Sequence, residues 1–287
     1  MTAHEETDKR LAEMERHLNG IYKRTAKEIE ETANAYFKQF KVEDEAKRKL
    51  VEAGELDPAE YERWRRTKIF YGKRYTRLKD DIAEQLTHTN ETAVAYCNDE
   101  LLPIYSINYN EVGNGIKSQI NGYSFEMVDA NTVKELSTKD LTLLPKRKLD
   151  IPADLVWNKR KIQAEMLQGL LQGDSIGKIA NRLRTVTDMN LNSSLRNART
   201  MVTGSENKGR IESMRTAISN GIKVRKQWIA TNDKRTRDWH AELQGKVEDV
   251  EKPFENAVGK IMFPGDPSAA PANVYNCRCS LGYVIVR

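Results

Sequence analysis

The chain has 287 residues, of which 31% are charged and 39% hydrophobic, and its mean hydropathy is -0.70. This length favours two domains, and the hydrophobic content suffices for a packed core, so wholesale disorder is not expected. No stretch approaches the roughly 18 apolar residues of a membrane-spanning helix, which argues against a membrane protein. Three cysteines are too few for a disulfide framework and fit a reducing compartment.

The net charge of +5 is unevenly distributed along the chain. Residues 1–150 carry 25 basic and 28 acidic side chains, whereas residues 159–237 carry 17 basic and 6 acidic ones. A segment of this sign suits contact with phosphate backbones or with an acidic protein partner. A solvated basic helix face explains it equally well, because charge alone does not identify a partner.

The first hundred residues predict two long amphipathic helices. In residues 9–40, apolar side chains recur at steps of three and four, from Leu11 to Phe40. A second helix is predicted to begin at Asp57, a suitable cap, with Pro58 at its first position, and to end before Pro103. Because neither apolar stripe is stable in water, we expect the two helices to pack antiparallel.

Glycine and proline punctuate the next segment, and its apolar periodicity is weak. We therefore interpret residues 103–150 as a connector with short irregular helices. The predicted domains are a long helical arm over 1–102, this connector, and a basic module of helices and a small sheet over 151–287.

The last module is predicted to change from helix to strand along its length. A first helix is expected at 158–172. A second, shorter helix is expected after a cap at Asp174 or Ser175. A third is expected at 189–219 and should end at Asn220 and Gly221. Strands are expected at 224–230, 247–250 and 278–286 from apolar alternation. The fold class is therefore α+β, with long helices in the N-terminal two thirds and a small antiparallel sheet near the C-terminus.

The residues best suited to metal binding or catalysis lie between 228 and 279. Two of the three cysteines, Cys277 and Cys279, are two positions apart, so on a strand they point to the same face. Together with His240 they offer three ligands of the type that Zn²⁺ prefers, with Asp233, a water or the distant Cys97 as the fourth.

The same three side chains are compatible with a site that holds no metal. Cys-x-Cys is not the common spacing of zinc knuckles, and these residues suit packing in a loop-rich domain equally well. A Cys–His nucleophile pair is conceivable, but no orienting third group or oxyanion hole is evident. We also expect the Arg237 guanidinium to pair with the carboxylate of Asp233 or Asp266.

Taken together, these residues resemble the C-terminal module of the phage Mu F-like minor head proteins, also called phage head morphogenesis proteins. The resemblance covers about residues 190–287. The matching residues, in chain order, are Arg199, Trp228, Asp233, Arg237, His240, Gly245, Pro264, Gly265, Asp266, Asn276, Cys277 and Cys279.

The resemblance implies a non-enzymatic structural role in the assembly of a tailed-phage head. The expected partners are the portal protein, coat or scaffolding proteins and, without sequence preference, double-stranded DNA during genome packaging or ejection. The expected location is the procapsid or virion, and the host cytoplasm during assembly. No cofactor is expected apart from a structural zinc. Some relatives carry toxin or ADP-ribosyltransferase domains after this module.

The basic residues of the module are the candidates for contact with DNA or an acidic partner. They are Arg196, Arg199, Lys208, Arg210, Arg215, Lys223, Arg225 and Lys226. An alternative function is a metal- or thiol-dependent hydrolase centred on His240, Cys277 and Cys279. A free nucleic-acid-binding regulator is a third hypothesis, but the sequence has no helix-turn-helix or zinc-finger signature.

Overall fold

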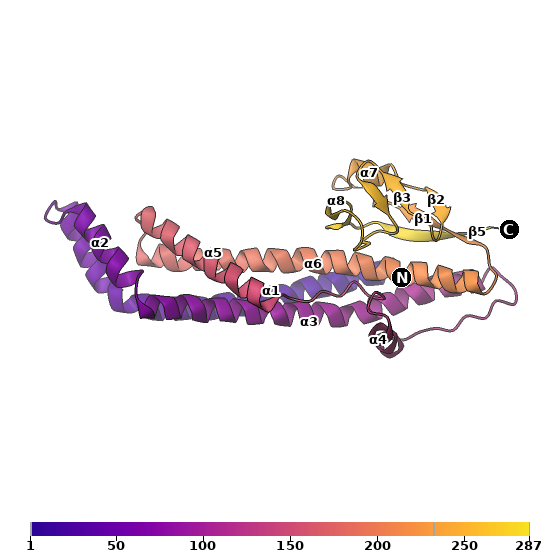
Figure 1. The fold of residues 1–287 in the computed structure, drawn as a ribbon, viewed down its shortest axis with the longest axis horizontal. Coiled ribbons are helices and arrows are strands. Elements are labelled where there is room, and N and C mark those ends of the chain that lie inside the picture. The colour runs from indigo at the N-terminus through magenta and orange to yellow at the C-terminus, as the bar shows by residue number, and fades with distance from the viewer. Residues whose placement is uncertain (1, 232, 287) are drawn as a thin grey trace. The chain divides into compact units, whose positions relative to one another are not determined.

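The computed structural model describes residues 2–231 and 233–286 and shows helices followed by a small antiparallel sheet (Figure 1). The helices are α1 (Ala3–Glu52), α2 (Pro58–Ile69), α3 (Lys73–Lys117), α4 (Ala130–Lys139), α5 (Ile151–Leu171) and α6 (Ile176–Ser219). They are followed by β1 (Val224–Ile229), α7 (Asp238–Ala241), β2 (Val247–Asp249), β3 (Phe254–Asn256), β4 (Gly259–Ile261), α8 (Pro271–Val274) and β5 (Ser280–Ile285). The predicted α+β class is confirmed. No described helix has the length and apolar character needed to cross a membrane.

The chain forms two compact units, and both draw on segments that are distant in sequence. Unit 1 comprises residues 1–17, 95–147 and 195–287, and unit 2 comprises residues 18–94 and 148–194. The long helices α1, α3 and α6 each contribute to both units.

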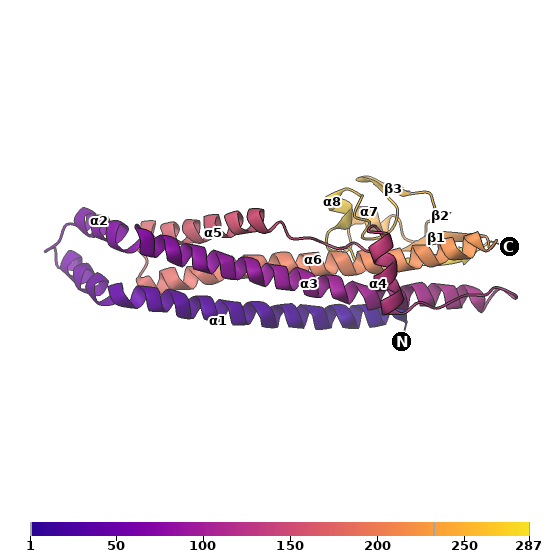
Figure 2. The ribbon, with the colours of Figure 1, turned by 60° about the horizontal axis from the view of Figure 1, so that its bottom comes forward.

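Within unit 2, α1 and α3 run antiparallel. The hydroxyls of Thr25 and Thr89 lie 2.9 Å apart, and Gln85 donates to Glu28 at 2.6 Å. Residue numbers therefore rise along α1 as they fall along α3. Their apolar stripes share a core with α5 and the first turns of α6, which includes Ile29, Ile82 and Ile162. Figure 2 shows α1 and α3 side by side.

The second predicted helix is divided and longer than expected. It breaks between α2 and α3, where Gly72 adopts a φ of +105° that side chains rarely tolerate. The expectation that helix ends before Pro103 is wrong, because α3 continues to Lys117. Proline removes one helical hydrogen bond, but Leu101, Ile104 and Tyr105 are buried beside it, and their packing outweighs that loss.

Several helix limits in the predicted connector and module also differ. The predicted connector contains the end of α3 and a further helix, α4, whose first turn is capped by Asp129 through the amide of Thr132 at 2.7 Å. Helix α5 begins at Ile151 rather than 158, capped by Asp150. The two helices expected after Ser175 form one helix, α6, because Val186 and Thr187 between them are buried and keep the chain helical.

Unit 1 contains the sheet. Its strand order is β2-β1-β5, with both pairs antiparallel, and Trp228 lies opposite Leu281. The three predicted strands are present, β1 and β2 one residue shorter than expected and β5 three residues shorter. The hairpin of β3 and β4 was not predicted, since three residues per strand are too few to show a period of two.

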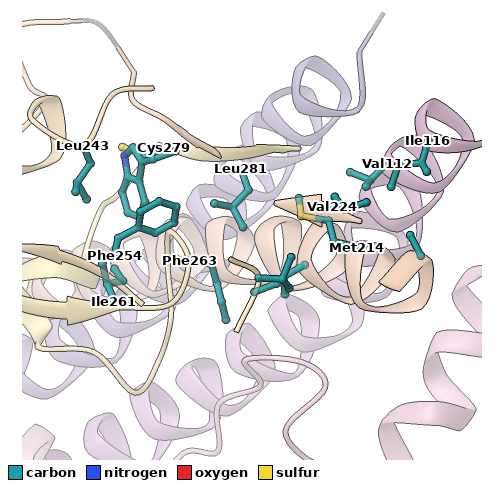
Figure 3. Close-up of a cluster of buried hydrophobic side chains, with 14 of the residues drawn as sticks. Val112, Ile116, Met214, Val224, Leu243, Phe254, Ile261, Phe263, Cys279 and Leu281 are labelled. Carbon is teal, nitrogen blue, oxygen red and sulfur yellow. The ribbon is translucent and has the colours of Figure 1, made fainter. Parts of the chain in front are cut away.

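The sheet packs on the C-terminal part of α6 (Figures 1 and 3). Met214 and Ile211 of the helix share a buried cluster with Val224, Trp228 and Leu281 of the strands. The same cluster includes both cysteines of the C-terminal motif, and Figure 3 labels Cys279 at its edge, near Leu243. The core of unit 1 thus extends to the predicted site.

Candidate functional site

His240, Cys277 and Cys279 come together in unit 1, as the sequence suggested. Nδ1 of His240 lies 3.6 Å from Sγ of Cys277 and 3.7 Å from Sγ of Cys279. One ligand atom from each residue lies within 4.8 Å of the other two. The residues are only 2%, 2% and 3% exposed, respectively, so the cluster is part of the interior.

Helix α6 fixes the backbone that carries the two cysteines. The hydroxyl of Thr203 donates to the carbonyl of Cys277 at 2.6 Å, and the amide of Asn207 donates to the carbonyl of Cys279 at 3.2 Å. Asn207 also accepts from the amide of Leu281 at 2.7 Å. Sequence reasoning missed Thr203 and Asn207. Their spacing of four, which places two polar groups on the buried side of one helix, was the available signal.

His240 is positioned by the short helix α7 and by an aromatic neighbour. Its ring packs edge-on against Trp228, with the ring centroids 5.3 Å apart. Trp228 is fully buried, and its carbonyl accepts from the amide of Gly245, which has a φ of +76°. These contacts explain why Trp228 and Gly245 belong to the motif: one packs the imidazole, and the other closes the turn behind α7.

The two thiols affect each other's ionisation. The hydrogen bond between them lowers the pKa of Cys279 and raises the pKa of Cys277, and burial opposes ionisation of both. The hydrogen bond with His240 further lowers the pKa of Cys279. Both sulfurs also have backbone hydrogen bonds: the amide of Cys279 donates to Cys277 Sγ at 3.5 Å, and Thr231 bonds Cys279. The site therefore favours negative charge on the sulfur of Cys279, with Cys277 as its protonated hydrogen-bond partner.

The cavity beside the cluster is small. It is lined by these three residues together with Thr231, Arg235, Thr236, Arg237, Asn276 and Arg278. Its volume is about 10 Å³, which is about the space that one water molecule needs. This small cavity has no room for a substrate. A larger hollow of about 540 Å³, lined by residues of α1 and α6, also borders Cys277, Arg237 and Arg278.

Asp233 lies outside the cluster. Its carboxylate accepts from the Arg278 guanidinium, with one N–O distance of 2.7 Å, and this hydrogen bond holds the Asp233 pKa well below its usual range. The predicted pairing of Arg237 with Asp233 or Asp266 is wrong, because Arg237 donates to the carbonyl of Tyr275. Arg278, which lies between the two cysteines, binds Asp233 instead.

The remaining motif residues shape loops. Asp266 accepts from the amides of Met262 and Ser268 at 3.0 and 2.9 Å, which stabilises the turn that contains Pro264 and Gly265. Asn276 has a φ of 55°, a left-handed conformation that asparagine tolerates, and it turns the chain into Cys277. Arg199 lies on α6 and pairs with Glu15 of α1 at 2.6 Å.

Most of the basic residues proposed for DNA contact bind groups of the protein itself. Arg199, Lys208, Arg210, Arg215 and Arg225 form ion pairs with carboxylates. Lys226 is fully buried, and its amine donates to the carbonyls of Val250 and Met262 at 3.0 and 2.9 Å. Arg196 lies over the ring of Tyr275, and Lys223 is exposed. Five of the eight candidate residues are thus paired with carboxylates within the fold.

Comparison with known proteins gives one family model and two relatives of different kinds. Residues 160–282 match the family model described as Phage Mu protein F like protein. The chain is 25% identical to the minor head protein GP7 of Bacillus phage SPP1 over 98% of this chain and 86% of that protein. It is 34% identical over 131 residues to the NAD(+)--arginine ADP-ribosyltransferase EFV of Enterococcus faecalis, a match covering 42% of this chain and 25% of that protein. No solved structure matches significantly. The resemblance to Mu F-like minor head proteins is confirmed.

Proposed function

Because its C-terminal module matches the Phage Mu protein F like family, we propose that this protein is a minor head component of a tailed phage or prophage, which acts in procapsid assembly by associating with the portal protein. The match to a minor head protein along nearly the whole chain carries this proposal. The family supports the general role in head morphogenesis. The portal, coat or scaffolding contacts, and a location in the procapsid and virion, are the specific parts proposed here.

An exposed apolar stripe on α5, in unit 2, supports a role in assembly. Trp157, Leu167 and Leu171 lie on one side of this helix at helical spacing. Their exposed fractions are 37%, 49% and 72%, respectively. Exposed apolar side chains that are contiguous mark protein interaction sites. We propose that this α5 stripe contacts the portal protein.

The charges around the stripe favour an acidic partner surface. Arg160 and Lys161 border the same hollow as Trp157, and the Lys161 amine lies 5.6 Å from the Trp157 ring centroid. The described ion pairs include neither of these two cations, in contrast to the paired arginines of α6. Since so many basic residues are paired internally, a protein partner explains the charge better than extensive contact with phosphates.

The proposal is tested by assembling heads from this protein with the portal and coat proteins of the same phage. Particles with and without portal are purified, and their content is measured by mass spectrometry. Low-copy incorporation that needs the portal supports the proposal. Absence from every particle, or equal incorporation without portal, contradicts portal association.

A pair of variants tests the α5 stripe. Leu167→Glu with Leu171→Glu should remove portal-dependent incorporation, because charge would have to be buried at the contact. The control, Asn34→Glu with Ala35→Glu, adds the same charge at exposed positions of α1, outside the stripe, and should be incorporated normally. Equal incorporation of both variants would show that the stripe is not the contact.

Contact with double-stranded DNA is a separate part of the proposal. Binding of the purified protein should weaken steeply with salt and be indifferent to sequence, because only phosphate contacts are expected. Lys223→Glu, at an exposed position, should weaken DNA binding further. A change at Lys226 would instead affect folding, because Lys226 is buried. Undetectable binding at low salt would remove DNA from the proposed partners.

The alternative of a metal- or thiol-dependent hydrolase has less support. His240, Cys277 and Cys279 are buried, and the cavity beside them is large enough for about one water molecule. The transferase relative shares only a quarter of its length with this chain, so its activity is a property of that protein. The family match favours a structural role.

A further inference from the structure

We propose that His240, Cys277 and Cys279 bind one Zn²⁺ ion, which fastens α7 to the segment entering β5 and acts as a structural site. The inference does not depend on the assembly role, because it rests only on the geometry of unit 1. The three residues come from two segments that the chain separates by more than thirty positions. A shared ion would join these segments at the edge of the core.

The distances between the donor atoms agree with one tetrahedral ion. With Zn–S of about 2.3 Å and Zn–N of about 2.1 Å, a tetrahedral site places sulfur and nitrogen about 3.6 Å apart. The observed separations between His240 Nδ1 and the two sulfurs are 3.6 and 3.7 Å. The three ligand atoms all lie within 4.8 Å of one another, so His240 and the two cysteines can reach one ion together.

The chemistry of the donors selects the metal. Two thiolates and an imidazole form a soft-to-borderline set that suits Zn²⁺ rather than Mg²⁺ or Ca²⁺. The ion and two thiolates sum to zero charge, which a site with side chains 2–3% exposed can accommodate. The backbone hydrogen bonds to both sulfurs stabilise thiolates in the same way as an outer shell does in metal sites.

The fourth ligand is a water molecule in the cavity beside the cluster. Its volume of about 10 Å³ matches about one water, so this position cannot take a substrate. Three protein ligands and a water are the composition of many catalytic zinc sites, but catalysis requires access for a substrate. The burial of all three protein ligands, which are 2–3% exposed, therefore assigns the ion a structural role.

Two features weaken the site. Nε2 of His240, which keeps its proton when Nδ1 binds metal, is buried without an acceptor among the described residues. Loss of such an outer-shell partner typically lowers metal affinity by about 10–100-fold. The Arg237 guanidinium borders the cavity and repels a cation. We therefore expect zinc to be removable by chelators.

Metal content of the full chain is the first test. Protein expressed with added zinc and purified under reducing conditions, without chelator, should contain about one zinc per chain, as a single tetrahedral site requires. The variant Cys277→Ser with Cys279→Ser should lose it. Cys97→Ser is the matched control, since Cys97 is also buried but lies on α3 outside the cluster. Zinc retained by the double variant, or no zinc in the wild type, overturns the proposal.

A measurement on the unaltered chain guards against variants that fail to fold. Protein stripped with EDTA is titrated with Zn²⁺ while alkylation of each cysteine is followed by mass spectrometry under partly denaturing conditions. Zinc should slow alkylation of Cys277 and Cys279 at least about tenfold more than that of Cys97, because Cys97 lies in the same unit but is not a ligand. Equal protection of all three cysteines, or none, contradicts a site at these residues. Titration with Co²⁺ should give tetrahedral thiolate–cobalt absorption bands, and octahedral bands would refute the ligand set.

Discussion

Gly204 of α6 and Gly265 of the turn before α8 approach each other backbone to backbone. A Cβ atom on Gly204 would lie 2.8 Å from the carbonyl oxygen of Gly265, and one on Gly265 would lie 2.5 Å from the amide nitrogen of Gly204. Gly265 also has a φ of +79°. The motif glycine therefore serves both the turn and its contact with the helix that carries Thr203 and Asn207.

Alanine at either glycine should destabilise unit 1. For Gly265→Ala, the left-handed backbone and the overlap together should cost about 2–4 kcal/mol, and for Gly204→Ala the overlap should cost about 1–3 kcal/mol. Denaturant unfolding measures both. Gly177→Ala is the control, because Gly177 also lies on α6 and a Cβ there meets nothing within 4 Å. A Gly204→Ala variant as stable as this control would show that the helix and turn separate freely.

Lys226 should make stability depend on pH in the alkaline range. Burial lowers its pKa to about 8 from the usual 10.5, so the unfolded chain binds this proton more tightly than the folded one. Stability should therefore rise as pH increases from about 8 towards 10.5, by up to about 3 kcal/mol from this group. The measurement is the difference in unfolding free energy between wild type and Lys226→Met at pH 7.5 and 9.5.

The comparison with Lys226→Met cancels the contribution of other titrating groups, such as buried tyrosines. The unfolding free energy of the wild type should increase relative to that of Lys226→Met as pH rises. A difference that stays constant between the two pH values would mean that the Lys226 amine keeps its proton equally well in the folded and unfolded states.

The start of α1 should loosen above neutral pH. His4 Nδ1 lies 2.8 Å from the carboxylate of Glu206, and this hydrogen bond raises the pKa of His4 above 6.5 although burial opposes it. The stabilisation is fully present below pH 6.5 and is lost as pH rises through the folded-state pKa. Hydrogen exchange in residues 3–10, corrected for its intrinsic pH dependence, should report this loss.

His4→Gln provides the control for this prediction. It retains a hydrogen-bond donor for Glu206 but cannot titrate, so protection of the first turns should no longer change between pH 6 and 8 beyond the intrinsic rate. Identical pH profiles of the variant and the wild type would assign the change to another group.

A buried polar layer should be essential for unit 2. Asn190 of α6 accepts from Asn90 of α3 at 2.7 Å and donates to Asn158 of α5 at 3.0 Å, and Asn90 in turn accepts from Tyr22 of α1 at 2.6 Å. Asn190→Ala would leave buried partners unsatisfied and should cost about 2–4 kcal/mol.

Asn192→Ala is the matched control for the polar layer. Asn192 lies two positions further along α6 and is exposed, so its replacement should change stability by no more than about 0.5 kcal/mol. Thermal unfolding of the two variants separates the predictions. Equal melting temperatures would show that water replaces the lost partner at Asn190.

The sequence by itself determined the fold class, the long helices and the three residues of the candidate metal site. Apolar side chains at steps of three and four mark α1 and α6 because one face of each helix must be buried. The spacing of Cys277 and Cys279 indicated a shared face, and His240 supplied a third donor of matching chemistry. These features are local, since they depend on residue type and spacing along one segment.

Only the tertiary structure decided the features that depend on partners distant in sequence. Helix α3 continues through Pro103 because its neighbours Leu101 and Ile104 are buried. Asp233 binds Arg278 rather than Arg237, and Lys226, which its charge placed among the basic candidates, is fully buried. The physical reason is that burial and ion pairing are set by which surfaces meet, and a period along one segment carries no record of the opposing surface.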